Sequence, residues 1–170
     1  MTIPHSLTHT KVTHSLRNAR ATVTILLVDD NHLVRELTKT LLRQVGYAVA
    51  EASNGQGAIH QAETRRYDML ITDLEMPEMD GFELARHLTK DRLALPVLVL
   101  SGALPNVVPL EELEKRRWAF LPKPVNRKEL IRTIDNNCLG WALHTQPGGS
   151  PQRSKLPIET MTTMFDRSSS

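Results

Sequence analysis

TILLVDDN, residues 24–31, is the stretch that decides the fold. After Thr24 it is apolar on both faces, which is typical of a strand covered by helices on each side. Two adjacent aspartates, Asp29 and Asp30, follow the apolar run directly. Leucine and valine then recur between residues 33 and 42 at the spacing of one helical face. The segment therefore predicts a buried strand that leads through acidic residues into a helix.

The same alternation of short apolar runs and helical patterns continues along the chain. We expect helices after Asn54 and Asn126, because asparagine is a favoured N-cap, and Glu129 lies three residues after Asn126 as in a capping box. The alternation predicts an α/β fold, a five-stranded parallel sheet with helices on both faces, over residues 23–143. The expected strands are 24–28, 47–50, 69–72, 96–100 and 119–121.

Two flanking segments differ from this middle region in composition. Residues 1–22 contain three histidines and show no clear period, so we expect a mobile N-terminal tail and favour a solvated tail over a metal site. Residues 144–170 begin with a stretch rich in proline, glycine and serine, which is typical of a flexible C-terminal tail.

Composition narrows the class of protein. Hydrophobic residues make up 40% and charged residues 24%, with no apolar run long enough to cross a bilayer and no secretory signal, so we expect a cytoplasmic protein that does not contact membranes. Residues 23–143 carry 15 basic and 17 acidic side chains, which disfavours a nucleic-acid surface. The single cysteine, Cys138, lies in a helical pattern and is interpreted as a packed thiol.

Polar residues that are able to do chemistry follow the expected strands. In a parallel sheet these strand ends gather at one edge. With strand order 2-1-3-4-5 the carboxylates of Asp29, Asp30 and Asp73 would lie side by side. Two unit charges about 4 Å apart repel by roughly 4 kcal/mol at an effective dielectric of about 20, and an all-oxygen cluster of this kind suits Mg²⁺. The residues in question are Asp29, Asp30, Asp73, Ser101 and Lys123.

Four segments together resemble bacterial two-component receiver domains over roughly residues 23–140. Each segment lies at the end of an expected strand, and their joint order makes the resemblance specific. The resemblance implies the flavodoxin-like receiver fold with strand order 2-1-3-4-5. The segments are ILLVDDN (25–31), DLEMPEMDG (73–81), VLSG (99–102) and FLPKP (120–124).

The resemblance implies a role for each acidic position. Asp73 is the expected phospho-acceptor, a carboxylate nucleophile that attacks a phosphohistidine. Asp30 and Asp73 would bind Mg²⁺ directly, together with the backbone carbonyl of Glu75, and Asp29 would hold it through water. Mn²⁺ is the alternative cation.

It also implies roles for three residues further along the chain. Lys123 would pair with Asp73 before phosphoryl transfer and with a phosphoryl oxygen afterwards. Ser101 would donate its hydroxyl to another phosphoryl oxygen, and Phe120 occupies the aromatic switch position. The Lys123–Pro124 bond is expected to be cis.

Each motif has a plainer interpretation when it is taken alone. Asp30 and Asn31 suit a helix cap, and Phe120 suits a core position. Met76-Pro77 and Asp80-Gly81 are common turn sequences. The conjunction of all four segments favours phospho-acceptor function.

The chain departs from the family pattern before the fifth strand. Lys115-Arg116-Arg117-Trp118 replaces the usual Gly-Ala pair, and Pro105 and Pro109 predict a short or shifted fourth helix. Trp118 either forms an exposed contact patch with Arg116 and Arg117 or covers the core.

The implied function is a phosphorylation-dependent switch rather than a turnover enzyme. Its expected partners are a histidine kinase or a histidine phosphotransfer protein and an unidentified downstream protein, with a phosphorylation-linked homodimer left open. The 27 residues after position 143 are too few for a DNA-binding domain. A phosphorelay intermediate, a haloacid-dehalogenase-type hydrolase and a phosphorylation-independent pseudo-receiver are the alternatives. The hydrolase would carry its nucleophile on the first strand, and the pseudo-receiver would lack an acidic or lysine position.

Overall fold

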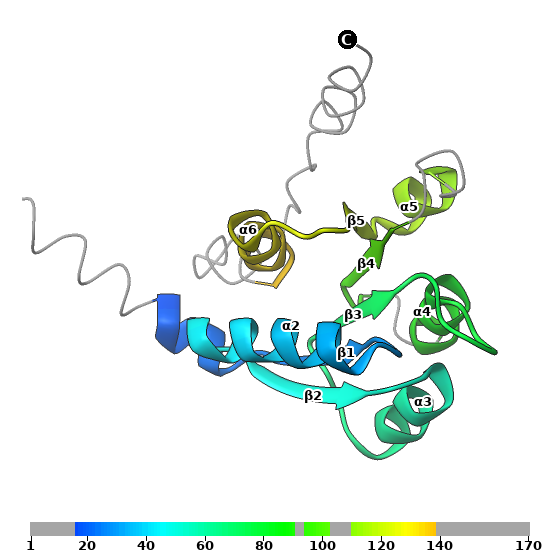
Figure 1. Cartoon of the computed structure of the whole chain (residues 1–170), viewed down its shortest axis with the longest axis horizontal. Helices are drawn as coiled ribbons and strands as arrows, with labels where there is room; N and C mark the ends of the chain where they lie inside the picture. The colour runs from blue at the N-terminus through cyan, green and yellow to red at the C-terminus, as the bar shows by residue number, and fades with distance from the viewer. Residues whose placement is uncertain (1–15, 91–93, 103–109, 139–170) are drawn as a thin grey trace, which may run out of the picture.

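The computed structural model describes residues 16–90, 94–102 and 110–138, and a parallel sheet lies at its centre (Figure 1). Five strands run in the order β2-β1-β3-β4-β5, and every neighbouring pair is parallel. Both the α/β class and the strand order are therefore as predicted. The strands are β1 Thr24–Val28, β2 Ala48–Ala52, β3 Met69–Asp73, β4 Val97–Ser101 and β5 Ala119–Pro122.

Helices cover both faces of the sheet (Figure 1). Alternate residues of β1 enter different cores: Ile25 packs in the cluster that includes residues of α2 and α6, and Leu26 in the cluster of α3, α4 and α5. This division explains why the strand sequences are apolar on both faces. The helices are α2 His32–Val45, α3 Gly55–Thr64, α4 Gly81–Thr89, α5 Leu110–Arg116 and α6 Arg127–Cys138. Within the described ranges no helix is both long and apolar enough to span a membrane.

Helix ends explain where the elements begin. The side chains of Asn54 and Asn126 accept bonds from backbone N–H groups in the first turns of α3 and α6, which confirms both predicted caps. At the end of α2, Gly46 adopts a φ of 113° and the amide of Tyr47 donates to the carbonyl of Leu42. Because Tyr47 closes the helix, β2 begins at Ala48 and not at residue 47 as expected.

The expected N-terminal boundary is wrong for part of the segment. Residues 16–21, within the segment that the sequence predicts to be a mobile tail, form a helix, blue in Figure 1. Leu16 and Ala19 pack against the core on the side of α2 and α6, and Arg20 forms an ion pair with Asp135 of α6. Two apolar positions are too few to give a readable helical period. Residues 1–15 of the expected N-terminal tail and the whole expected C-terminal tail, 144–170, lie outside the described residues.

Trp118 lies in the core and not on the surface. It is 6% exposed, and its ring stacks on Phe82 of α4 with centroids 6.1 Å apart. The hypothesis of an exposed contact patch is therefore wrong, because the indole fills the space between α4 and α5. Within the described residues α5 is short, as expected, whereas Pro105 and Pro109 lie outside them.

The surroundings of Cys138 confirm the prediction of a packed thiol. Its Sγ lies 3.3 Å from Sδ of Met69 in the central sheet. Burial raises the pKa of the Cys138 thiol to about 12, so the nucleophilic thiolate is disfavoured at neutral pH.

Candidate functional site

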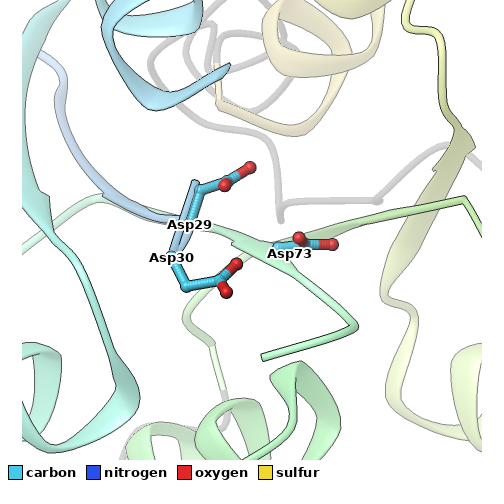
Figure 2. Close-up of side chains that lie close together, drawn as sticks. All are labelled: Asp29, Asp30 and Asp73. Atoms are coloured by element: carbon cyan, nitrogen blue, oxygen red, sulfur yellow. The ribbon is translucent and has the colours of Figure 1, made fainter. Parts of the chain in front are cut away.

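Three carboxylates meet at the carboxyl edge of the sheet. Asp29 and Asp30 follow β1 and Asp73 ends β3, and these two strands are direct neighbours. One carboxylate oxygen from each residue lies within 4.8 Å of the others. Figure 2 shows the three side chains extending the same way from the strand ends. Asp29 and Asp73 are buried and Asp30 is exposed, so the cluster opens to solvent on one side.

Lys123 offsets part of this negative charge. Its Nζ lies 2.8 Å from Oδ2 of Asp73 and 3.1 Å from Oδ2 of Asp29. Burial raises the pKa of Asp29, although the ammonium of Lys123 opposes that effect. For Lys123 itself burial acts to lower the pKa, but hydrogen bonding to Asp73 and the two negative charges outweigh it and raise the pKa. Lys123 therefore stays charged between two carboxylates.

The neighbouring strands bring the other predicted residues to the same edge. Ser101 is fully buried at the end of β4, and its carbonyl accepts from the amide of Lys123 at 2.7 Å. The Lys123–Pro124 peptide is cis, as expected. Phe120 lies on β5, partly exposed, and packs against the core cluster of α3, α4 and α5.

The turn after β3 is shaped around the backbone of Asp73. The amide of Glu75 donates to Oδ1 of Asp73 at 3.3 Å, and Glu75 itself is exposed. A Cβ added at Gly81 would lie 2.2 Å from the carbonyl oxygen of Asp73, so only glycine fits there. Asp80 caps α4 through a capping box with Glu83. The turn chemistry expected for Asp80-Gly81 therefore also determines how closely α4 approaches Asp73.

Sequence reasoning missed one side chain that touches the acidic loop. Nη1 of Arg35, one turn into α2, donates to the backbone carbonyl of Asp29. Its Nε donates to Glu51 of β2 at 3.3 Å. Arginine is common on the polar face of an amphipathic helix, so the sequence does not distinguish an arginine that makes such a contact from one that is exposed to solvent.

The donor set fits a divalent cation. Carboxylate oxygens are hard ligands, and three of them from two strands converge within the span that one ion can bridge. With no cation bound, the repulsion between these carboxylates is only partly offset by Lys123. Oxygen ligands of this kind suit Mg²⁺ or Mn²⁺ better than metals that prefer nitrogen or sulfur.

Comparison with known proteins gives a consistent family match. A family model described as the response regulator receiver domain matches residues 25–135. The sensor protein EvgS of Escherichia coli K12 is 45% identical over 80 residues, which cover 47% of this chain and 7% of EvgS. The chain spans well under two thirds of the length of the curated relatives that it matches first.

Solved structures extend the likeness to the whole fold. A response regulator receiver domain protein from Clostridium thermocellum superimposes with a TM-score of 0.64 at 27% identity, covering 71% of this chain and 98% of that one. The response regulator protein TrrA from Thermotoga maritima, solved in complex with Mg(2+)-BeF, gives a TM-score of 0.62 at 28% identity, covering 68% and 99%.

Proposed function

This chain belongs to the response regulator receiver domain family, and on that premise we propose that Asp73 is its phospho-acceptor. Receiver domains are phosphorylation-dependent signalling modules that interact with histidine kinases or phosphotransfer proteins. The observation that carries the proposal is the pairing of Asp73 with Lys123 at 2.8 Å inside a cluster of three carboxylates. Asp29 also contacts this ammonium, but at 3.1 Å, so Asp73 makes the shorter of the two contacts with Lys123.

In the proposed reaction a carboxylate oxygen of Asp73 attacks the phosphorus of a phosphohistidine. A new O–P bond forms as the N–P bond breaks, and the imidazole keeps the electron pair. Lys123 holds the Asp73 carboxylate before transfer and pairs with a phosphoryl oxygen afterwards. Ser101 then donates its hydroxyl to a second phosphoryl oxygen, and Phe120 turns inward as the aromatic switch.

The proposed cation ligands are the carboxylates of Asp30 and Asp73 and the backbone carbonyl of Glu75, with Asp29 bound through water. Support comes from the converging oxygens and from the Mg(2+)-BeF complex of TrrA. When bound, Mg²⁺ or Mn²⁺ supplies charge neutralisation for the oxygens of the transferring group. The chain's own contribution is to hold its carboxylates at the edge of the sheet before the cation arrives.

Output in this proposal is protein binding. The phosphoryl group adds roughly −1.5 to −2 units of charge at the sheet edge and biases a two-state surface. The chain would catalyse only its own phosphotransfer and dephosphorylation, and its downstream partner would be a protein. A phosphorylation-linked homodimer, a phosphorelay step and a cytoplasmic location stay predictions.

The proposal is tested by incubating the purified chain with acetyl phosphate and Mg²⁺ and measuring its intact mass. We expect a gain of one phosphoryl group that requires the cation and is lost in Asp73→Asn. Glu63→Gln, which removes an exposed carboxylate on α3, is the matched control and should label like the wild type. Labelling of Asp73→Asn at the wild-type level would contradict the proposal, as would steady hydrolysis of phosphomonoesters.

A further inference from the structure

Arg35 connects the acidic loop to two other elements. From α2, Nη1 of Arg35 donates to the backbone carbonyl of Asp29 at 2.5 Å, and Nε donates to Oε2 of Glu51 on β2 at 3.3 Å. The guanidinium side chain is only 11% exposed. It therefore fastens the end of β1 to both the helix that follows and the neighbouring strand.

The carbonyl that Arg35 holds belongs to the peptide between the two loop aspartates. A peptide unit is planar, so fixing the Asp29 carbonyl fixes the orientation of the Asp30 amide and the direction in which the chain leaves β1. The side chain of Asp29 is held separately, because its Oδ1 accepts from the amide of Asn31 at 2.9 Å. Asp30, the exposed member of the cluster, therefore depends on this peptide plane for its position.

Glu51 neutralises much of the positive charge that Arg35 brings close to the proposed divalent-cation site. Glu51 pairs with Arg35 on one oxygen and with Lys39 on the other, at 2.7 Å. Hydrogen bonding from Lys39, with a smaller contribution from Arg35, holds the pKa of Glu51 below its usual range, so the carboxylate stays ionised. The guanidinium thus contributes directed hydrogen bonds with its positive charge largely neutralised by Glu51.

We propose that Arg35 is a positioning residue for the divalent-cation site, which it pre-forms by holding the Asp29–Asp30 peptide, with Glu51 as its anchor. This inference rests on the proposed function. Residues that orient metal ligands without touching the metal typically change metal affinity by about 10–100-fold. Because Arg35 acts before the cation binds, its loss should weaken Mg²⁺ binding without lowering the phosphorylation rate at saturating Mg²⁺.

The test compares Mg²⁺ dissociation constants by calorimetry in the wild type, Arg35→Met and Lys39→Met. Lys39→Met is the matched control. Lys39 lies one turn later on α2 and pairs with the same carboxylate, Glu51, so the variant removes a positive charge without removing a contact to Asp29. We expect Mg²⁺ affinity to fall about tenfold in Arg35→Met and to stay within about twofold of the wild type in Lys39→Met. A through-space charge effect has the opposite sign, since deleting a positive charge near the site favours a cation.

Two further readouts separate positioning from general loosening. The amide ¹⁵N shift of Asp30 reports hydrogen bonding at the Asp29 carbonyl, and it should move in metal-free Arg35→Met and stay in place in Lys39→Met. The Mg²⁺ concentration for half-maximal phosphorylation by acetyl phosphate should rise about tenfold in Arg35→Met, with the maximal rate unchanged. Arg35→Lys, which keeps the charge without the two-directional fork, should restore only part of the affinity.

The outcomes are distinguishable. If Arg35→Met binds Mg²⁺ as tightly as the wild type, or more tightly, the positioning role is wrong and the proposed function is unaffected. A wild type that binds no Mg²⁺ would overturn the proposed function and this inference with it. Should Arg35→Met fail to fold, Glu51→Gln takes its place, with a smaller loss of affinity and the same movement of the Asp30 amide expected.

Discussion

Lys123 Nζ lies 2.8 Å from Oδ2 of Asp73, and the same ammonium lies 3.1 Å from Oδ2 of Asp29. One cation thus joins two buried carboxylates that come from different strands. In this arrangement the lysine and a divalent cation compete for the same negative charge.

Replacing Lys123 with methionine should affect stability and metal binding in opposite directions. Without the ammonium, the free energy of unfolding of the metal-free protein should fall by about 2 kcal/mol, because two buried carboxylates lose their partner. Mg²⁺ should bind more tightly, by up to roughly tenfold, because a competing positive charge is gone. Urea unfolding without metal and calorimetric titration measure the two effects. Equal or weaker Mg²⁺ binding in the variant would show that no such competition exists.

Asp29→Asn should stabilise the metal-free protein at neutral pH. Burial raises the pKa of Asp29, so its ionised form is disfavoured by folding and costs stability at any pH above the raised value. The advantage of the variant should shrink as the pH falls through that raised pKa, and vanish below the ordinary value of 3.8, where the carboxyl is protonated in both states. Thermal unfolding in EDTA between neutral and acidic pH measures this. An advantage that grew on acidification would have the wrong sign.

Gly81→Ala should disrupt the turn beside the acceptor. The added Cβ would lie 2.2 Å from the carbonyl oxygen of Asp73, and backbone must move to relieve it. We expect a loss of about 3 kcal/mol in the free energy of unfolding, together with slower phosphorylation. Gly57→Ala on α3 is the control. Its added Cβ would lie 3.1 Å from the side-chain oxygen of Asn54, and alanine has the higher helix propensity. The change in the free energy of unfolding should therefore stay under about 1 kcal/mol. If Gly81→Ala were as stable as the wild type, Gly81 could not lie as close to the carbonyl oxygen of Asp73 as the structure places it.

Arg117→Gly should stabilise the protein. Arg117 directly follows α5 and has a φ of 57°. Its amide donates to the carbonyl of Glu114, and that of Trp118 to the carbonyl of Leu113, as in a Schellman motif. Gly46 occupies the equivalent position after α2, where the left-handed conformation costs least. We expect a gain of about 0.5–1 kcal/mol in chemical unfolding for Arg117→Gly. Arg117→Ala removes the same side chain but keeps the backbone cost, and it should show no gain.

The sequence predicts the sheet and most of the candidate site for one physical reason. Strands buried on both faces are apolar throughout, so their ends are visible where polar residues begin, and those ends gather at one edge of a parallel sheet. The positions of Asp29, Asp73 and Lys123 after these strands therefore predict that they lie together, as they do. The β2 boundary could not, because Tyr47 is apolar enough for a strand while its amide closes α2.

Other features depend on contacts between distant residues. Trp118 suits a surface or a core equally well by composition, and only the space between α4 and α5 decides. The helix at residues 16–21 forms through tertiary packing and the Arg20–Asp135 ion pair, which no local pattern predicts. The hold of Arg35 on the Asp29 carbonyl is likewise set by the register of α2 against β1 and β2.

The most direct test of the central claim identifies the phosphorylated residue chemically. The chain is phosphorylated with acetyl phosphate and Mg²⁺, reduced with borohydride, which converts an aspartyl phosphate into homoserine, and digested for peptide mass spectrometry. The account predicts homoserine at position 73 and unmodified aspartate at Asp29 and Asp30. Homoserine at another acidic residue, or a phosphoryl group recovered on histidine or serine alone, would contradict it.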